Sequence, residues 1–180
     1  MLHSYDVLHF AGHCVYDEEH PEDSGWIFSG GKRLSADELS RIDRVPSFVF
    51  SNACESGITP DRSGLRSVDL APSFAERFFD HGVTNFVCTA WPVDDVAART
   101  FALSLYANQL GLSSVEAQET RYESTPPQSM HVARREARLA IAGDLGGART
   151  WGAYQHYGSP YFRFFDPATM YRDRTSPNDA

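Results

Sequence analysis

Short apolar runs alternate with longer segments of helical pattern along the chain. Residues 5–10, 48–52 and 83–89 are rich in aromatic and β-branched side chains. Runs of this length and composition predict buried strands. Residues 151–158 form a last aromatic run, which predicts a further strand that residues 161–164 extend.

Helical spacing of apolar residues fills most of the space between these runs. The pattern predicts a helix over residues 71–81, which Gly82 ends. It predicts a second helix from Asp94 or Asp95 to about residue 110, because either carboxylate suits an N-cap. A third helix is predicted over about residues 131–142, after an insertion at residues 111–129 that has no stable period.

Two local signals lie between the first and second strands. Residues 25–28 and 33–34 flank Gly30 and Gly31, which predicts a small hairpin with a Gly-Gly turn. Ser35 stands three residues before Glu38, the spacing of a capping box, so a short helix is expected from there to about residue 42.

Strands that alternate with helices predict an α/β fold around a mainly parallel sheet. We expect one domain over residues 1–165 and a flexible C-terminal tail over residues 166–180, which is polar. The first predicted strand opens at residue 5, so the leading strand–helix units of a doubly wound sheet are missing. An exposed apolar edge strand favours aggregation, and we therefore expect an upstream domain or a partner chain to cover it.

Composition narrows the class of function. The chain has 180 residues, a net charge of −8 and three cysteines. A negative chain lacks the cationic footprint that nucleic acid or an anionic membrane surface requires, so neither is an expected partner. No transmembrane segment or signal peptide is visible, and unpaired cysteines suit a reducing compartment, which indicates a cytoplasmic protein. The excess of Arg over its single Lys is typical of a GC-rich bacterial genome.

Reactive side chains follow the predicted strands. His13 comes after the first strand, Cys54 after the second, and Trp91, Asp94 and Asp95 after the third. Reactive groups of α/β sheets gather at the carboxyl ends of parallel strands. A thiol and an imidazole at two such ends are the minimal parts of a nucleophile and its base.

Four segments, in order, resemble a CHAT domain, the caspase-like peptidase module related to separases. The first two are Leu8-His9-Phe10-Ala11-Gly12-His13 and Ser51-Asn52-Ala53-Cys54-Glu55-Ser56-Gly57. The third is residues 87–95. The fourth lies within residues 151–160 and consists of Trp151-Gly152-Ala153-Tyr154 and Tyr157-Gly158-Ser159-Pro160. The resemblance implies a caspase-like three-layer sandwich that lacks its first strands in this chain. It also implies a peptide-bond hydrolase in which His13 is the base and Cys54 the nucleophile, with a protein or peptide substrate and no cofactor or metal.

The resemblance has one departure near the expected oxyanion site. CHAT domains usually carry glycine directly after the histidine, where this chain has Cys14. The backbone N–H groups of Cys14 and Cys54 are the candidate oxyanion donors, and Gly12 leaves room for the substrate backbone. Only glycine lacks a Cβ and takes positive φ freely, so Cys14 affects the oxyanion geometry and not the catalytic pair.

Other interpretations of these residues stay open. Trp91 is a candidate pocket wall, and Asp94 or Asp95 either caps the following helix or selects a basic residue at the cleaved bond. Cys88 lies within a predicted strand and is expected in the core. Cys14 is either structural or the partner of Cys54 in a reversible disulfide. A zinc site is not supported by the spacing of the Cys and His residues.

Three functions follow from these residues. The first is a cysteine endopeptidase that uses Cys54 and His13. The second is a catalytically inactive CHAT-fold module that serves interaction or regulation, and the third is another thiol enzyme, such as an acyltransferase, on a similar sheet.

Overall fold

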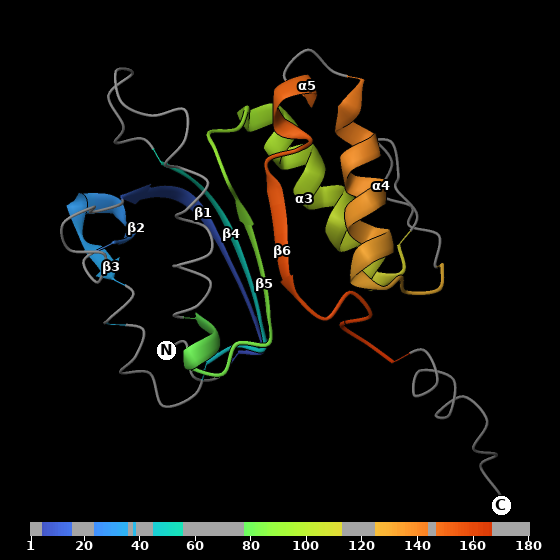
Figure 1. Cartoon of the computed structure of the whole chain (residues 1–180), viewed down its shortest axis with the longest axis horizontal. Helices are drawn as coiled ribbons and strands as arrows, with labels where there is room; N and C mark the ends of the chain where they lie inside the picture. The colour runs from blue at the N-terminus through green and yellow to red at the C-terminus, as the bar shows by residue number, and fades with distance from the viewer. Residues whose placement is uncertain are drawn as a thin grey trace, which may run out of the picture. The chain divides into compact units, whose positions relative to one another are not determined.

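The computed structural model describes residues 5–15, 24–35, 38, 45–55, 78–112, 125–143 and 147–166 (Figure 1). Contacts divide the chain into two compact units. The first joins Met1–Asp94 with Arg149–Gly158, and the second joins Asp95–Ala148 with Ser159–Ala180. The first unit holds the sheet, and the second holds the two long helices.

The sheet of the first unit is mixed. Its strands, among the described residues, are β1 (Val7–Val15), β2 (Gly25–Ile27), β3 (Arg33–Ser35), β4 (Phe48–Glu55), β5 (Asn85–Thr89) and β6 (Tyr154–Gly158), in the order β3-β2-β1-β4-β5-β6. Parallel pairing joins β1 to β4 and β4 to β5. The other three pairings are antiparallel. The α/β class is therefore confirmed, with parallel strands at the centre of the sheet and antiparallel strands at its flanks.

Two strands are longer than the apolar runs that predicted them. β1 continues from the run at residues 5–10 through Val15, and β4 continues through Glu55. The ladder between them pairs Ala11 with Asn52 and Gly12 with Ala53, so small and polar residues stay extended. His13 and Cys54 consequently lie inside the ends of their strands and not in the loops beyond.

The core of the first unit covers one face of the sheet. It contains Trp26, Val49, Ala53, Phe78, Val83, Phe86 and Cys88, and Leu8, Phe10 and Cys14 pack against it. The Trp26 ring stacks on Phe10 with centroids 4.5 Å apart, and its Nε1–H donates a hydrogen bond to Ser51 Oγ at 2.9 Å. Every second side chain of β1 and β4 lies on this face, and the side chains that alternate with them lie on the opposite face.

The predicted hairpin and capping box are confirmed. Gly30 and Gly31 have φ values of +81° and +74° in the turn between β2 and β3. Ser35 Oγ accepts the backbone N–H of Glu38 at 3.1 Å, and a Glu38 carboxylate oxygen accepts the N–H of Ser35 at 3.0 Å. The rest of that short helix lies outside the described residues. Of the predicted helix at residues 71–81, the described part is helical at residues 78–80 and ends at Gly82, which has φ +96°.

Gly25 permits a close approach of two strands. A Cβ at this position would lie 2.2 Å from the Leu34 carbonyl oxygen and 2.7 Å from Ser35 Cα, both of which are backbone atoms. We expect Gly25→Ala to lower the free energy of unfolding by about 1–3 kcal/mol, because β2 and β3 must separate to accept a methyl group. Urea denaturation measures this loss. Gly30→Ala is the matched control for added volume, since nothing lies within 4 Å of its Cβ position, although its φ of +81° adds some strain.

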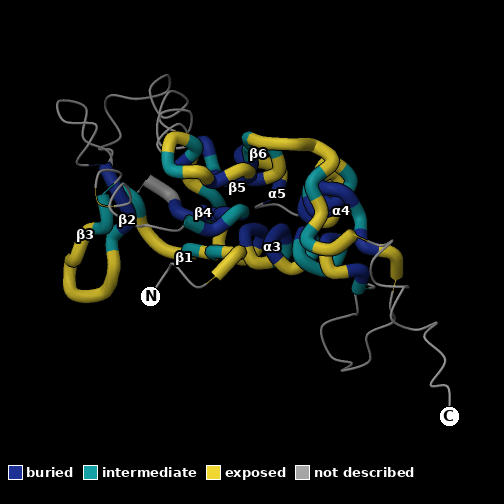
Figure 2. The backbone as a smooth tube through the Cα atoms, turned by 90° about the horizontal axis from the view of Figure 1, so that it is seen from below, coloured by how far each residue is buried: buried dark blue, intermediate teal, exposed yellow. Residues whose placement is uncertain are grey.

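One edge of β1 is only partly covered. β2 pairs with β1 at His13, Cys14 and Val15, and no other described strand pairs with residues 7–12 on that side. Tyr5 is 63 % exposed and Val7 is 41 % exposed. Figure 2 shows this exposure along β1 beside the buried β4.

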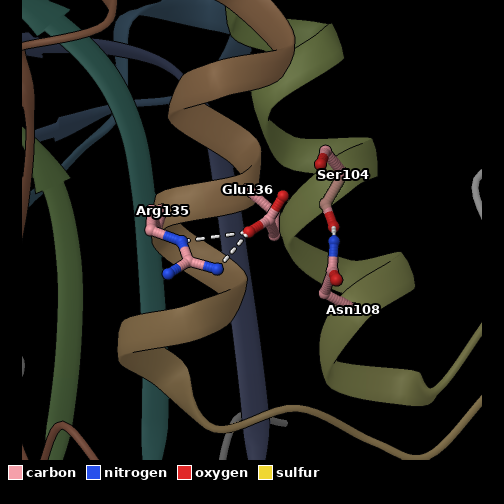
Figure 3. Close-up of polar contacts among 4 residues, drawn as sticks. All are labelled: Ser104, Asn108, Arg135 and Glu136. Atoms are coloured by element: carbon pink, nitrogen blue, oxygen red, sulfur yellow. Dashed lines mark hydrogen bonds and ion pairs between the residues drawn. The ribbon is translucent and has the colours of Figure 1, made fainter.

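The second unit is built on α3 (Asp95–Leu110) and α4 (Met130–Ala142), which pack against each other. These bounds confirm the two predicted helices. Figure 3 shows two contacts of these helices: the 2.7 Å ion pair between Arg135 and Glu136 of α4, and the hydrogen bond from Asn108 Nδ2 to the Ser104 carbonyl oxygen of α3. A short helix, α5 (Gly147–Thr150), leads back to β6.

The ends of the predicted insertion at residues 111–129 are held together. The Thr125 N–H bonds the Gly111 carbonyl oxygen at 2.7 Å, and the Gln128 N–H bonds that of Asn108 at 2.8 Å. Residues 113–124 lie outside the described part, as do residues 167–180 of the predicted tail.

Candidate active site

The ladder between β1 and β4 places His13 opposite Cys54. The register pairs each residue from Val7 to Cys14 with one from Phe48 to Glu55, without interruption. Neighbouring strands lie about 4.8 Å apart, and paired positions share a face of the sheet. The side chains of Cys54 and Glu55 lie outside the described part of the structure. The backbone nevertheless brings the predicted base and the predicted nucleophile to adjacent positions on the face opposite the core.

The His13 side chain is accessible. The residue is exposed, and its ring has no hydrogen bond to another described residue. β2 supports the backbone at this point, because His13 pairs with Ile27 on the side away from β4. An imidazole in this position is free to turn towards a bound molecule.

Cys14 and Gly12 lie on the core face. Cys14 is partly buried against the core cluster, and its Sγ lies 3.8 Å from the Val15 carbonyl oxygen. A Cβ on Gly12 would lie 2.9 Å from the Phe10 ring, so the space that this glycine leaves is next to that ring. Any contact of Cys14 or Gly12 with a substrate on the other face would therefore be made by backbone atoms.

Trp91 stands two residues beyond the end of β5, in a fixed orientation. Its Nε1–H donates to the Arg149 carbonyl oxygen at 2.9 Å. A Cβ on Gly152 would meet the indole ring at 3.4 Å, so this glycine lets the ring lie against the backbone. The ring is 36 % exposed and presents a rigid aromatic surface.

The strand end that carries Trp91 is next to the end of β4. The last pair of this ladder joins Ser51 to Cys88, and Thr89 Oγ1 donates to the Ala53 carbonyl oxygen at 3.1 Å. Cys54, near the end of β4, thus lies between His13 of β1 on one side and the segment that follows β5 on the other.

The two predicted pocket acids differ in their setting. The Asp94 N–H bonds the buried Thr150 Oγ1 at 3.2 Å, and the Asp94 side chain is exposed. Asp95 is also exposed and is the first residue of α3, in the second unit. Asp94 directly precedes the first helical residue, so of the two predicted candidates Asp94 stands at the N-cap position.

Cys88 is a core residue, as expected. It is 5 % exposed, and burial, with a smaller effect from Cys14, raises the pKa of its thiol to about 12. A thiol with such a pKa is almost fully protonated at neutral pH and is a poor nucleophile.

The sequence patterns assigned no role to Asn52 and Tyr154, a polar pair near the predicted nucleophile. Tyr154 of β6 is fully buried, and its hydroxyl donates to Asn52 Oδ1 at 3.0 Å. Asn52 is two residues before Cys54 and therefore lies on the same face of β4. The polar pair Ser51-Asn52, directly after the apolar residues 48–50 of β4, could have pointed to Asn52, whereas nothing local pointed to Tyr154.

His9 lies on the same face of β1 as His13 and stacks on Phe50, with ring centroids 4.6 Å apart. Burial lowers the pKa of its imidazole from the ordinary value of 6.5. The unfolded chain therefore binds the proton more readily than the folded chain does. The stability present above about pH 6.5 is lost as the pH falls through the folded-state pKa.

We expect the free energy of unfolding to depend less on pH in His9→Gln than in the wild type. The free energy of unfolding, measured by urea denaturation between pH 7.5 and 5, should fall less steeply in His9→Gln than in the wild type. Parallel curves for the wild type and His9→Gln would contradict a lowered pKa of His9 in the folded chain.

Metal binding and membrane insertion have no structural signal in the described residues. No group of three or more His, Cys, Asp or Glu side chains there is placed to hold a metal ion. None of the described helices combines the length and apolar composition that a membrane-spanning segment needs.

A scan against protein-family models matches residues 1–159 to the CHAT domain. A search of curated proteins found no match. The matched range contains β1, β4, β5 and β6, together with His13, Cys54 and Trp91. The chain belongs to the CHAT domain family.

Proposed function

We propose that the protein is a caspase-like cysteine endopeptidase that cleaves a protein substrate. The observation that carries the proposal is the register of the central ladder, in which His13 stands opposite Cys54. The family supports it, because CHAT is a caspase-like family. A caspase-like three-layer sandwich is proposed on the same ground.

The reaction uses these two residues in sequence. His13 takes the thiol proton while Cys54 Sγ attacks the peptide carbonyl carbon. Backbone N–H groups at Cys54 and Cys14 stabilise the oxyanion. The C–N bond then breaks, and the leaving amine takes the proton from His13. Water attacks the thioester, releases the new carboxyl terminus and restores the thiol.

Trp91 and an acidic residue form the proposed substrate pocket. The indole is held by a backbone hydrogen bond and by contact with Gly152, so it forms a wall at no further cost in side-chain entropy. The exposed Asp94, three residues after Trp91, is proposed to favour a basic residue at the cleaved bond, and Asp95 is the second candidate. Aromatic faces and carboxylates together suit an Arg or Lys side chain.

The open edge of β1 is the proposed contact for an upstream domain or a partner chain. Residues 7–12 offer unpaired backbone groups on the side away from β4, among the described strands. Such an edge takes up a further strand readily.

The second candidate is an inactive CHAT-fold interaction module. The observation that favours it is the His13 ring, which no described residue orients by a hydrogen bond. The residue Cys14, in place of the usual glycine, also favours it.

A peptide-library cleavage assay separates the two functions. The wild-type full chain should cleave a subset of peptides, and Cys54→Ala should cleave none. Labelling of Cys54 by iodoacetamide, located by mass spectrometry, shows whether the thiol is accessible. Reactive Cys54 without any cleavage would favour the interaction module, and acyl transfer to an amine without net hydrolysis would favour an acyltransferase.

A further inference from the structure

One row of residues crosses the sheet directly beside the His13 and Cys54 positions. Ala11 pairs with Asn52, and Thr89 pairs with Tyr154. The β4–β5 register pairs Ser51 with Cys88, and one further step places Asn52 opposite Thr89. Ala11, Asn52, Thr89 and Tyr154 thus form a single row, one side-chain step before the row that holds His13 and Cys54.

The Tyr154 hydroxyl fixes the Asn52 amide within this row. Tyr154 reaches across the short Thr89 side chain, and its hydroxyl donates to Asn52 Oδ1 at 3.0 Å. The Tyr154 ring itself is fully buried and makes a T-shaped contact with the Phe50 ring. A buried aromatic ring has few rotamers, so the amide oxygen is held on the β6 side of Asn52.

The Asn52 amide keeps a donor group for another partner. Its Nδ2 carries two N–H donors, and no described residue accepts from them. The oxygen faces β6, so the planar amide turns Nδ2 away from that side. On the β1 side the neighbour is Ala11, an exposed residue whose methyl group leaves space above it.

Asn52 is too far from the thiol to act on the reacting atoms themselves. Residues two apart in a strand are separated by about 6.6 Å. The amide therefore reaches a group next to the scissile bond. Every peptide offers main-chain carbonyl oxygens there, and these accept hydrogen bonds from amide N–H groups.

We infer that Asn52 Nδ2 donates a hydrogen bond to a main-chain carbonyl oxygen of the bound peptide, and that Tyr154 is its positioning residue. The inference rests on the proposed peptidase function. It adds a substrate contact on the face of β4 that carries Cys54, two residues before this nucleophile in the sequence. Such a contact is made in the ground state as well as the transition state, so its loss raises KM more than it lowers kcat.

A pair of variants tests the contact. Tyr154→Phe keeps the donor and loses only its positioning, so KM should rise about threefold. Asn52→Leu with Tyr154→Phe removes the amide and the hydroxyl that bonds it together, so neither is left without the other. This double variant should fold as the wild type does and should raise KM about tenfold, with kcat changed less than about threefold.

Two measurements and a control variant accompany the kinetics, which use the library peptide that the wild type cleaves fastest. Urea denaturation reports folding, and the rate of Cys54 alkylation by iodoacetamide reports the state of the thiol. Neither should differ between the double variant and the wild type. Tyr157→Phe is the matched control, because Tyr157 is on the same strand but packs against the core on the opposite face, and its KM should not change.

The outcomes are distinct. Wild-type KM in the double variant would overturn the inference and leave the peptidase function intact. A rise in KM accompanied by an equal fall in Cys54 alkylation would also overturn it, because Asn52 would then act through the thiol. A wild type that cleaves no library peptide would overturn the peptidase function, and with it the inference.

Discussion

Cys54→Ala lowers the kcat/KM of peptide cleavage by about 10⁴-fold or more, with the fold unchanged. The physical reason is that no other described thiol can replace it. Cys88 is buried with a pKa raised to about 12, and Cys14 packs on the core face. Removing the nucleophile of a peptidase leaves only the rate that binding and the oxyanion donors supply. Hydrolysis of the fastest library peptide measures the loss.

His13→Ala should have an effect of similar size, and the double variant should be no slower than either single variant. A nucleophile and its base act as one unit, so their effects do not add. His9→Gln is the matched control, since His9 lies four residues earlier on the same face and stacks on Phe50. Additive losses, or an equal loss in His9→Gln, would show that His13 is not the base of Cys54.

Trp26→Ala lowers the free energy of unfolding by about 3–5 kcal/mol, the usual range for a large buried aromatic residue. Trp26 is 1 % exposed and lies against both Phe10 and Phe78. Trp26→Phe should lose about 1–2 kcal/mol, because Ser51 Oγ then lacks its indole donor. Urea denaturation followed by far-UV circular dichroism measures both changes.

Trp151→Ala is the control for this substitution. Trp151 is 48 % exposed, so its loss should change stability by less than about 0.5 kcal/mol. Trp26 also sits on β2, which pairs with His13 and Val15 of β1. Equal stability of the two alanine variants would mean that β2 does not hold this end of β1.

Local patterns in the sequence predicted the elements well. The apolar runs at residues 48–52 and 83–89 became β4 and β5, and the carboxylates at residues 94–95 marked the start of α3. These features depend on near neighbours in the chain, so composition and spacing suffice to find them. The capping box of Ser35 and Glu38 was predicted for the same reason, with both of its hydrogen bonds present.

Long-range pairing was harder to predict. The sheet was expected to be mainly parallel, yet β2, β3 and β6 run antiparallel to their neighbours. Strand direction is set by how the connections cross the sheet, and a short apolar run carries no information about it. The bond between Tyr154 and Asn52 joins residues 102 positions apart, so no spacing rule could reveal it.

The position of His13 shows a further limit. Ala11 and Gly12 have low strand propensity and suggested that β1 had ended before the histidine. Two ladders, to β2 and to β4, keep this segment extended. Tertiary pairing thus overrode the local preference.

The unbroken ladder from Val7 to Cys14 has a consequence for how this sequence can change in length. Side chains alternate with a period of two, so a one-residue deletion inside β1 would turn the histidine onto the core face. A two-residue deletion would keep its face but move it one full step from the cysteine. Insertions and deletions in relatives that retain the pair should therefore fall outside this strand, or be balanced by an equal change in β4.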